Sequence, residues 1–202
     1  SIHEIYGITT RNKVIYNGRR KELFYEDIKK PLLFSMGRIW DEAKNIQLLS
    51  NIAKGLKWPV YIAGNNIDPD TGEAPDPENV HFIGQLAPDE MHACMSRASI
   101  FVMPAKYEPF GLAVLEAAKA GCALALSNID TLREIWGDAA VYFDPFDEED
   151  SIMAIQRLIE DESLRKEMAA RAVIRAKDFT VEKMAGKYIE LYQTLIETTN
   201  QQ

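Results

Sequence analysis

Two short apolar runs with a helical stretch between them restrict the fold of this chain severely. The runs are residues 99–103, SIFVM, and residues 122–126, CALAL. Neither alternates strictly between apolar and polar residues, as expected of strands buried on both faces of a parallel sheet. Between them, the loop PAKYEPFG leads into LAVLEAAKAG, which is rich in alanine and leucine. Strand, helix and strand in this order predict a βαβ unit.

The same alternation continues along the chain. It predicts an α/β fold, a Rossmann-like parallel sheet with helices on both faces. Residues 1–20 are expected to be a linker with one short strand, residues 21–177 the main domain, and residues 178–202 a terminal helix. Asp161 and Thr180 are the expected caps of the last two helices. Strands are predicted at residues 13–16, 32–36, 60–63, 80–83, 99–103 and 122–126. Helices are predicted at residues 41–57, 88–97, 148–161, 163–177 and 181–198, with a further helix that starts near residue 112.

The start of the helix at Leu112 is a candidate anion site. The first amides of a helix have no partner within it, and the helix dipole adds partial positive charge there. Gly111 directly precedes this helix, and its lack of a side chain permits close approach of a ligand to the backbone. The sequence therefore predicts that a negatively charged group binds here.

Glu116 is the one polar residue between Leu112 and Ala118. A carboxylate on an otherwise apolar helix is costly to bury without a partner. Two interpretations remain open from this pattern. Glu116 either faces a polar cleft or pairs with Lys119 on the surface of the same helix.

Arg38 and Lys44 follow the predicted strand that ends at Gly37. Ligands of α/β sheets bind beyond the carboxyl ends of the strands, so both cations are expected at the ligand edge. Two cations can neutralise a diphosphate, and an arginine can do so with a fork of donors. The alternative is a pair of solvated surface cations.

Glu108 and Glu116 carry a family resemblance. They are separated by seven residues, with PFGL after the first and LEA around the second. This spacing resembles the E-x7-E motif of retaining GT-B glycosyltransferases, in particular glycosyltransferase family four, also called glycosyl transferases group one. The resemblance implies that the chain is the C-terminal, donor-binding half of a GT-B fold. It implies that Glu116 holds the donor ribose, that Glu108 lies beside the donor sugar, and that the amides around Phe110, Gly111 and Leu112 meet the sugar and phosphates.

The resemblance extends to other donor-side positions. Gly37, Arg38 and Lys44 are similar to the glycine-arginine and lysine set that contacts the donor phosphates. Glu108, Arg38 and Lys44 are thereby the expected catalytic residues. The further donor-side positions are Gly64, which ends a strand, and the base-side loop from Gly84 to Leu86.

Two segments depart from the family pattern. Cys122-Ala123 stands where Pro-Val is usual, and the loop Ser127-Asn128-Ile129-Asp130 lacks the usual paired glycines. These departures concern contacts to the donor sugar and not the fold.

The implied partner is a nucleotide-diphosphate sugar, with no cofactor and no metal. Asp68-Pro69-Asp70 could grip a divalent cation beside a diphosphate, but Asp70-Thr71-Gly72 also fits a plain turn. The resemblance further implies a missing N-terminal acceptor domain. We expect the chain alone to bind donor without transferring sugar, and any peripheral membrane association to come through that domain.

Composition excludes several other classes. The net charge of −8 argues against a nucleic acid held through its phosphate backbone. No apolar run approaches the roughly 20 residues of a membrane span, and no signal peptide is visible. Cys94 and Cys122 have no metal-like spacing, which indicates reduced, structural thiols and a cytoplasmic location.

Two further functions fit the same architecture. A nucleotide-sugar epimerase would need a general acid and base in the cleft, and neither His81 nor His92 is placed for that role. A non-catalytic nucleotide-sugar-binding module is the other alternative. The retained set of Arg38, Lys44, Glu108 and Glu116 argues against such a degenerate half.

Overall fold

A six-stranded parallel sheet forms the centre of the molecule. In this computed structural model, the described residues are 13–20, 27–67, 72 and 76–199. The strand order is β3-β2-β1-β4-β5-β6, and every pairing is parallel. The predicted α/β sheet with helices on both faces is confirmed. The strands are β1 (Lys30–Met36), β2 (Val60–Ala63), β3 (Val80–Phe82), β4 (Ala98–Met103), β5 (Ala123–Ser127) and β6 (Val141–Phe143).

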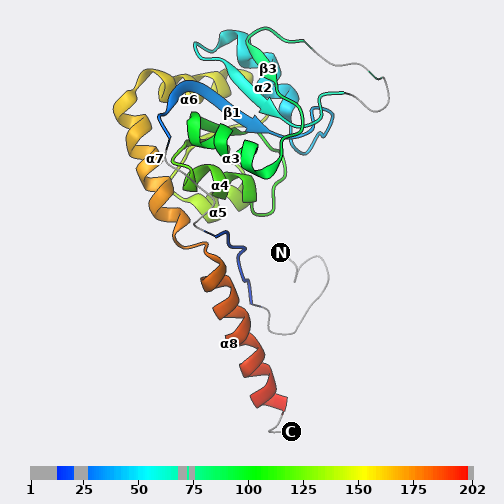
Figure 1. Ribbon diagram of the computed structural model, residues 1–202, viewed down its shortest axis with the longest axis vertical. Helices are drawn as coiled ribbons and strands as arrows, with labels where there is room; N and C mark the ends of the chain where they lie inside the picture. Colours follow the sequence, from blue (N-terminus) through cyan, green and yellow to red (C-terminus); the bar gives the residue numbers. More distant parts are fainter. Residues whose placement is uncertain (1–12, 21–26, 68–71, 73–75, 200–202) are drawn as a thin grey trace.

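Helices cover the two faces of the sheet in separate layers (Figure 1). One layer holds α3 (Pro88–Arg97), α4 (Leu112–Lys119) and α5 (Asp130–Trp136), which build one core. The other holds α2 (Ile46–Ile52) and α6 (Glu148–Glu160), which build the second core. Helix α7 (Glu162–Ala176) contributes to both cores, through Met168 in one and Ala172 in the other.

The central strands are buried as their sequences require. All six residues of β4 and all five of β5 are buried, and Phe101 lies opposite Leu124 in the register between them. Two serines are buried among these apolar side chains. Ser35 Oγ donates to Val102 O at 2.8 Å and Ser127 Oγ donates to Met103 O at 3.1 Å, so neither hydroxyl is left without a partner.

The last helix, α8 (Val181–Thr199), extends away from the layered body (Figure 1). Both predicted caps are confirmed, because Asp161 accepts from Leu164 N at 2.8 Å and Thr180 accepts from Lys183 N at 3.2 Å. The outer part of α8 leaves Ile189, Tyr192 and Leu195 exposed.

Two sequence predictions are wrong in this part of the fold. Residues 13–16 form no strand, because Lys13 and Tyr16 meet α8 and aromatic rings instead of a strand edge. The helix predicted at residues 41–57 is confined to Ile46–Ile52, with a short 3₁₀ turn after it (Ala53–Gly55). Helix α5 and strand β6 are further elements that the sequence pattern did not reveal.

Candidate donor-binding site

The candidate site lies at the carboxyl edge of the sheet, where two adjoining hollows meet. One, of about 350 Å³, lies beyond β1 and β2, and the other, of about 420 Å³, lies between β1 and the start of α4. Met36, Gly37 and Lys44 line both, so the hollows share a wall. Of the predicted site residues, the first hollow is lined by Gly37, Arg38, Lys44, Gly64 and Leu86, and the second by Gly37, Lys44, Glu108, Phe110, Gly111 and Leu112.

Glu108 and Lys44 form an ion pair in the lining of the second hollow. Lys44 Nζ donates to Glu108 Oε2 at 2.7 Å, and the Glu108 side chain is only 13% exposed. Burial would raise the pKa of the Glu108 carboxyl. The Lys44 ammonium and two backbone amides outweigh that effect and leave the pKa below its ordinary value.

The second oxygen of Glu108 meets the start of α4. Glu108 Oε1 accepts from Gly111 N at 2.8 Å and from Phe110 N at 3.4 Å. Gly111 has φ 81°, a left-handed conformation that favours glycine. Two of the three amides predicted to meet the donor sugar and phosphates therefore already hold a carboxylate. The first amide that bonds back along α4 is Leu115 N, so the amides of Leu112 to Val114 are the ones that the helix leaves for a ligand.

Arg38 lies at the rim of the first hollow. Its Nη2 is 2.7 Å from Asp41 Oδ2, its guanidinium lies over the Trp40 ring, and its side chain is 56% exposed. Asp41 Oδ1 in turn accepts from Ala43 N at 3.1 Å, which shapes the turn that carries Lys44. Burial would raise the pKa of Asp41, but Arg38 and the backbone amides hold it below its usual range.

Asn45 fixes this turn and explains why the helix starts late. It has φ 54° and is 8% exposed. Its amide nitrogen donates to Pro104 O at 3.0 Å and to Pro145 O at 2.9 Å. A left-handed residue cannot continue a right-handed helix, so Lys44 lies in a turn before α2 and not inside the helix as predicted. Sequence reasoning missed Asn45 because its partners are distant in the chain.

Glu116 is not among the residues that line the two hollows. The ion pair of Glu116 is with Arg19, whose Nε lies 2.7 Å from Glu116 Oε1, and not with Lys119 as one interpretation had it. The other interpretation, that Glu116 faces a polar cleft, stays a prediction. Lys119 instead donates through its ammonium to the carbonyl of Arg19. Gly84 stands beside the first hollow, where its carbonyl accepts from Gly64 N at 2.8 Å.

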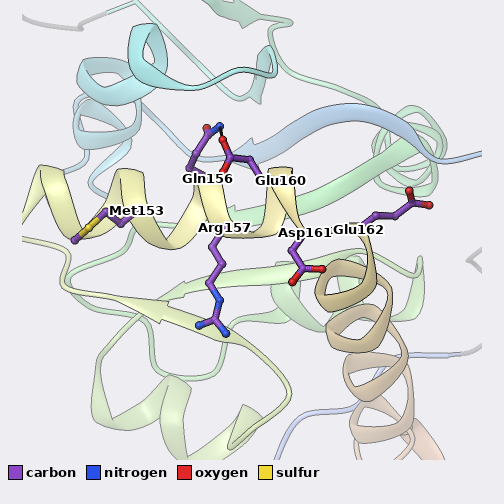
Figure 2. Close-up of a pocket in the computed structure, with 6 residues that line it drawn as sticks. All are labelled: Met153, Gln156, Arg157, Glu160, Asp161 and Glu162. Carbon is purple, nitrogen blue, oxygen red and sulfur yellow. Dashed lines mark hydrogen bonds between the residues drawn. The ribbon is translucent and has the colours of Figure 1, made fainter.

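A third hollow, of about 580 Å³, lies on α6 at the opposite edge of the sheet (Figure 2). Glu160 lines this hollow and forms an ion pair with Lys57, which lies just before the start of β2. The hollow is therefore near the amino-terminal ends of the strands. Figure 2 shows Gln156 and Glu160 together on one side of α6 while Arg157 points away from them. The polar groups do not converge, so this hollow is a poor ligand site.

Within the described residues, no three or more His, Cys, Asp or Glu side chains gather as a metal site would require. Asp68 and Asp70, the alternative metal residues, lie outside the described residues. The helices of the described part are too short or too polar to cross a membrane.

Residues 18–175 match the family described as "Glycosyl transferases group 1". The chain belongs to the group 1 glycosyltransferases. The matched range contains every predicted donor-side residue.

Curated relatives in this family include two bacterial transferases. The chain is 26% identical over 193 residues to the N,N'-diacetylbacillosaminyl-diphospho-undecaprenol alpha-1,3-N-acetylgalactosaminyltransferase of Campylobacter jejuni, covering 91% of this chain and 51% of that protein. It is 32% identical over 116 residues to O-antigen chain mannosyltransferase B of Escherichia coli, covering 57% of this chain and 30% of that protein. The chain thus spans about half or less of the length of these relatives.

Solved glycosyltransferase structures share the fold and confirm the GT-B type. Sucrose-phosphate synthase from Thermosynechococcus elongatus superposes with a TM-score of 0.82 at 21% identity, covering 98% of this chain and 56% of that one. Anabaena Alr3699/HepE, solved in complex with UDP and glucose, superposes with a TM-score of 0.76 at 18% identity, covering 90% of this chain and 57% of that one.

Proposed function

We propose that this chain is the donor-binding part of a retaining glycosyltransferase that uses a nucleotide-diphosphate sugar. The observation that carries the proposal is the cluster at the start of α4, where Lys44, Glu108 and the amides around Gly111 meet at one edge of the sheet. A group 1 glycosyltransferase with UDP-binding structural neighbours would place a diphosphate at such a cluster. In this proposal residues 21–177 bind the donor, residues 1–20 and 178–202 lead to and from an acceptor domain, and the chain alone transfers no sugar.

The proposed binding mode assigns each group a task. Arg38, Lys44 and the first-turn amides of α4 hold the diphosphate, with Lys44 shared between the phosphates and Glu108. The base lies toward Gly84 and Leu86, and the ribose toward Glu116.

Bond cleavage between the sugar and the diphosphate leaves growing negative charge on the leaving group. Cations and helix amides that are fixed before reaction stabilise this charge without reorganising. Glu108, with its lowered pKa, stays ionised beside the sugar and can accept hydrogen bonds from the sugar hydroxyls. No metal is needed for this electrostatic task.

The deciding experiment compares nucleotide binding to the wild-type chain and to Glu116→Gln by calorimetry, with UDP, GDP and ADP as probes. Loss of a charged hydrogen bond to the ribose should weaken the preferred nucleotide by about 1.5–3 kcal/mol. Unchanged affinity would remove Glu116 from the site. Saturation-transfer measurements with the corresponding nucleotide sugars identify the donor.

A further inference from the structure

Arg19 holds the carboxylate that the proposed function assigns to the ribose. The Arg19 Nε lies 2.7 Å from Glu116 Oε1, and the Glu116 side chain is 13% exposed whereas that of Arg19 is 43% exposed. Val114, Leu115, Ala117 and Ala118 of the same helix are fully buried. A carboxylate on such a helix needs a partner, and Arg19 is the cation that the structure places against it.

The backbone around Arg19 is fixed on both sides. Arg19 N donates to Phe179 O at 3.2 Å, its carbonyl accepts from Lys119 Nζ, and it forms a parallel bridge with Thr180. Gly18 lies so close to Thr180 that an added Cβ would be 2.2 Å from the Thr180 oxygen. Because this backbone is constrained, the Arg19 guanidinium has a fixed position and can orient the Glu116 carboxylate.

The same segment reaches the donor hollow. Asn17 lines the second hollow together with Leu112 and Ala113, which lie on the face of α4 that also carries Glu116. Residues 17–19 therefore run along the ligand-facing side of α4. Arg19 engages one carboxylate oxygen of Glu116, and a carboxylate has about four lone-pair positions, so acceptor positions remain for ribose hydroxyls.

From these contacts we infer that Arg19 is a positioning residue for ribose recognition, acting through Glu116. It holds the carboxylate in one orientation and leaves acceptor positions free, and so makes the site select a nucleotide with ribose hydroxyls over a deoxy analogue. This inference rests on the proposed function and adds to it a residue from the segment before the sheet.

The test uses the 202-residue chain and measures the ratio of affinities for a ribonucleotide and its 2′-deoxy analogue. UDP, GDP and ADP are titrated by calorimetry with their 2′-deoxy counterparts, and the pair with the tightest ribonucleotide is followed in the variants. Arg19→Ala should weaken the ribonucleotide by about three- to tenfold, the size expected for residues coupled through one contact. It should change the deoxy analogue much less, and Arg19→Lys should restore part of the preference.

Arg20→Ala is the matched control, because it removes the same charge from the neighbouring, exposed position. Both nucleotides should bind this variant as they bind the wild type. Tighter ribonucleotide binding by Arg19→Ala would show that Arg19 competes with the ribose, and equal weakening of both nucleotides would show that it acts on the phosphates. Either result overturns the inference.

The Glu116→Gln variant distinguishes a failure of the role proposed for Arg19 from a failure of the proposed donor-binding function. If Glu116→Gln loses the ribose preference and Arg19→Ala keeps it, the inference fails and the proposed function stands. If Glu116→Gln also keeps the preference, Glu116 is not the ribose residue and the inference fails with it. If no nucleotide binds the wild-type chain, the proposed function itself is wrong.

Discussion

The two glutamates of the site are held by different parts of the molecule. Glu108 is held from within the domain, by Lys44 from the turn after β1 and by the Gly111 amide that directly precedes α4. Glu116, which lies within α4, is paired with Arg19 from the segment that leads into the sheet. The proposed phosphate side is thus organised by the core of the fold, whereas the proposed ribose side depends on a segment that packs against the core from outside.

The largest expected effect concerns the phosphate side. Lys44→Ala removes the ammonium that pairs with Glu108 and leaves that carboxylate without its cation. We expect nucleoside diphosphates to bind about 2 kcal/mol more weakly, roughly thirtyfold, because a charged hydrogen bond to the phosphate is lost. The nucleoside alone should lose much less. Calorimetry with the diphosphate and the nucleoside measures both.

Two further variants serve as a comparison and a control for Lys44→Ala. Arg38→Ala should act in the same direction but less, because its side chain is 56% exposed and already pairs with Asp41. Lys57→Ala removes another lysine–glutamate pair at the opposite edge of the sheet and should not affect binding. Equal losses in diphosphate and nucleoside binding for Lys44→Ala would place the phosphates elsewhere.

The next effect concerns the segment that carries Arg19. Gly18→Ala adds a Cβ that would lie 2.7 Å from Val181 N and still closer to Thr180, so the segment must shift. We expect a loss of about 1–2 kcal/mol in the free energy of unfolding, typical of overpacking. Hydrogen exchange should speed up at the Arg19 amide and stay unchanged at Gly111, which Glu108 holds.

Gly186→Ala serves as the control for that variant. A Cβ at this position of α8 meets nothing within 4 Å. The substitution should be neutral or slightly stabilising, since alanine favours a helix. If Gly18→Ala also leaves exchange at Arg19 unchanged, the segment is not anchored by its fit against Thr180.

A smaller effect is expected from pH. The folded-state pKa of Glu108 lies below its ordinary value of 4.5, so the unfolded state binds the proton more readily. The stabilisation by this group is therefore complete above pH 4.5 and is lost as pH falls through the folded pKa. Thermal unfolding of wild type and Glu108→Gln at pH 3 to 7 should show a difference of about 1 kcal/mol that shrinks at acidic pH. A difference that stays constant down to pH 3 would contradict this ion pair.

The smallest effect should come from a chelator. Fixed cations and helix amides are proposed to hold the diphosphate, so EDTA should leave nucleotide affinity unchanged within error. A strict requirement for magnesium or manganese would instead direct attention to Asp68 and Asp70.

The sequence predicted the centre of the fold well because local signals agree there. The runs at β4 and β5 are apolar throughout, and Gly111 marks the start of α4, so strand, loop and helix follow from neighbouring residues. The same local signals predicted that Lys44 and Glu108 lie at one edge of the sheet. Strand β6 escaped prediction because its three residues are too few to show a period.

The errors have a common physical cause, which is a partner far along the chain. The apolar spacing after Asp41 is helical, but Asn45 is held in a left-handed conformation by two distant proline carbonyls. Similarly, Lys119 is the obvious local partner for Glu116, yet the partner is Arg19, which lies far earlier in the chain. Side-chain pairing across such separations leaves no trace in local periodicity.

Asn45 also limits how this scaffold could be redesigned. Its single side chain ties together the turn after β1, the loop after β4 at Pro104 and the loop after β6 at Pro145. Grafting one of these loops from another protein would leave buried amide hydrogens without acceptors and would displace the neighbouring Lys44. Engineers who wish to alter donor preference would therefore have to transplant the three loops as one unit, with Asn45 kept between them.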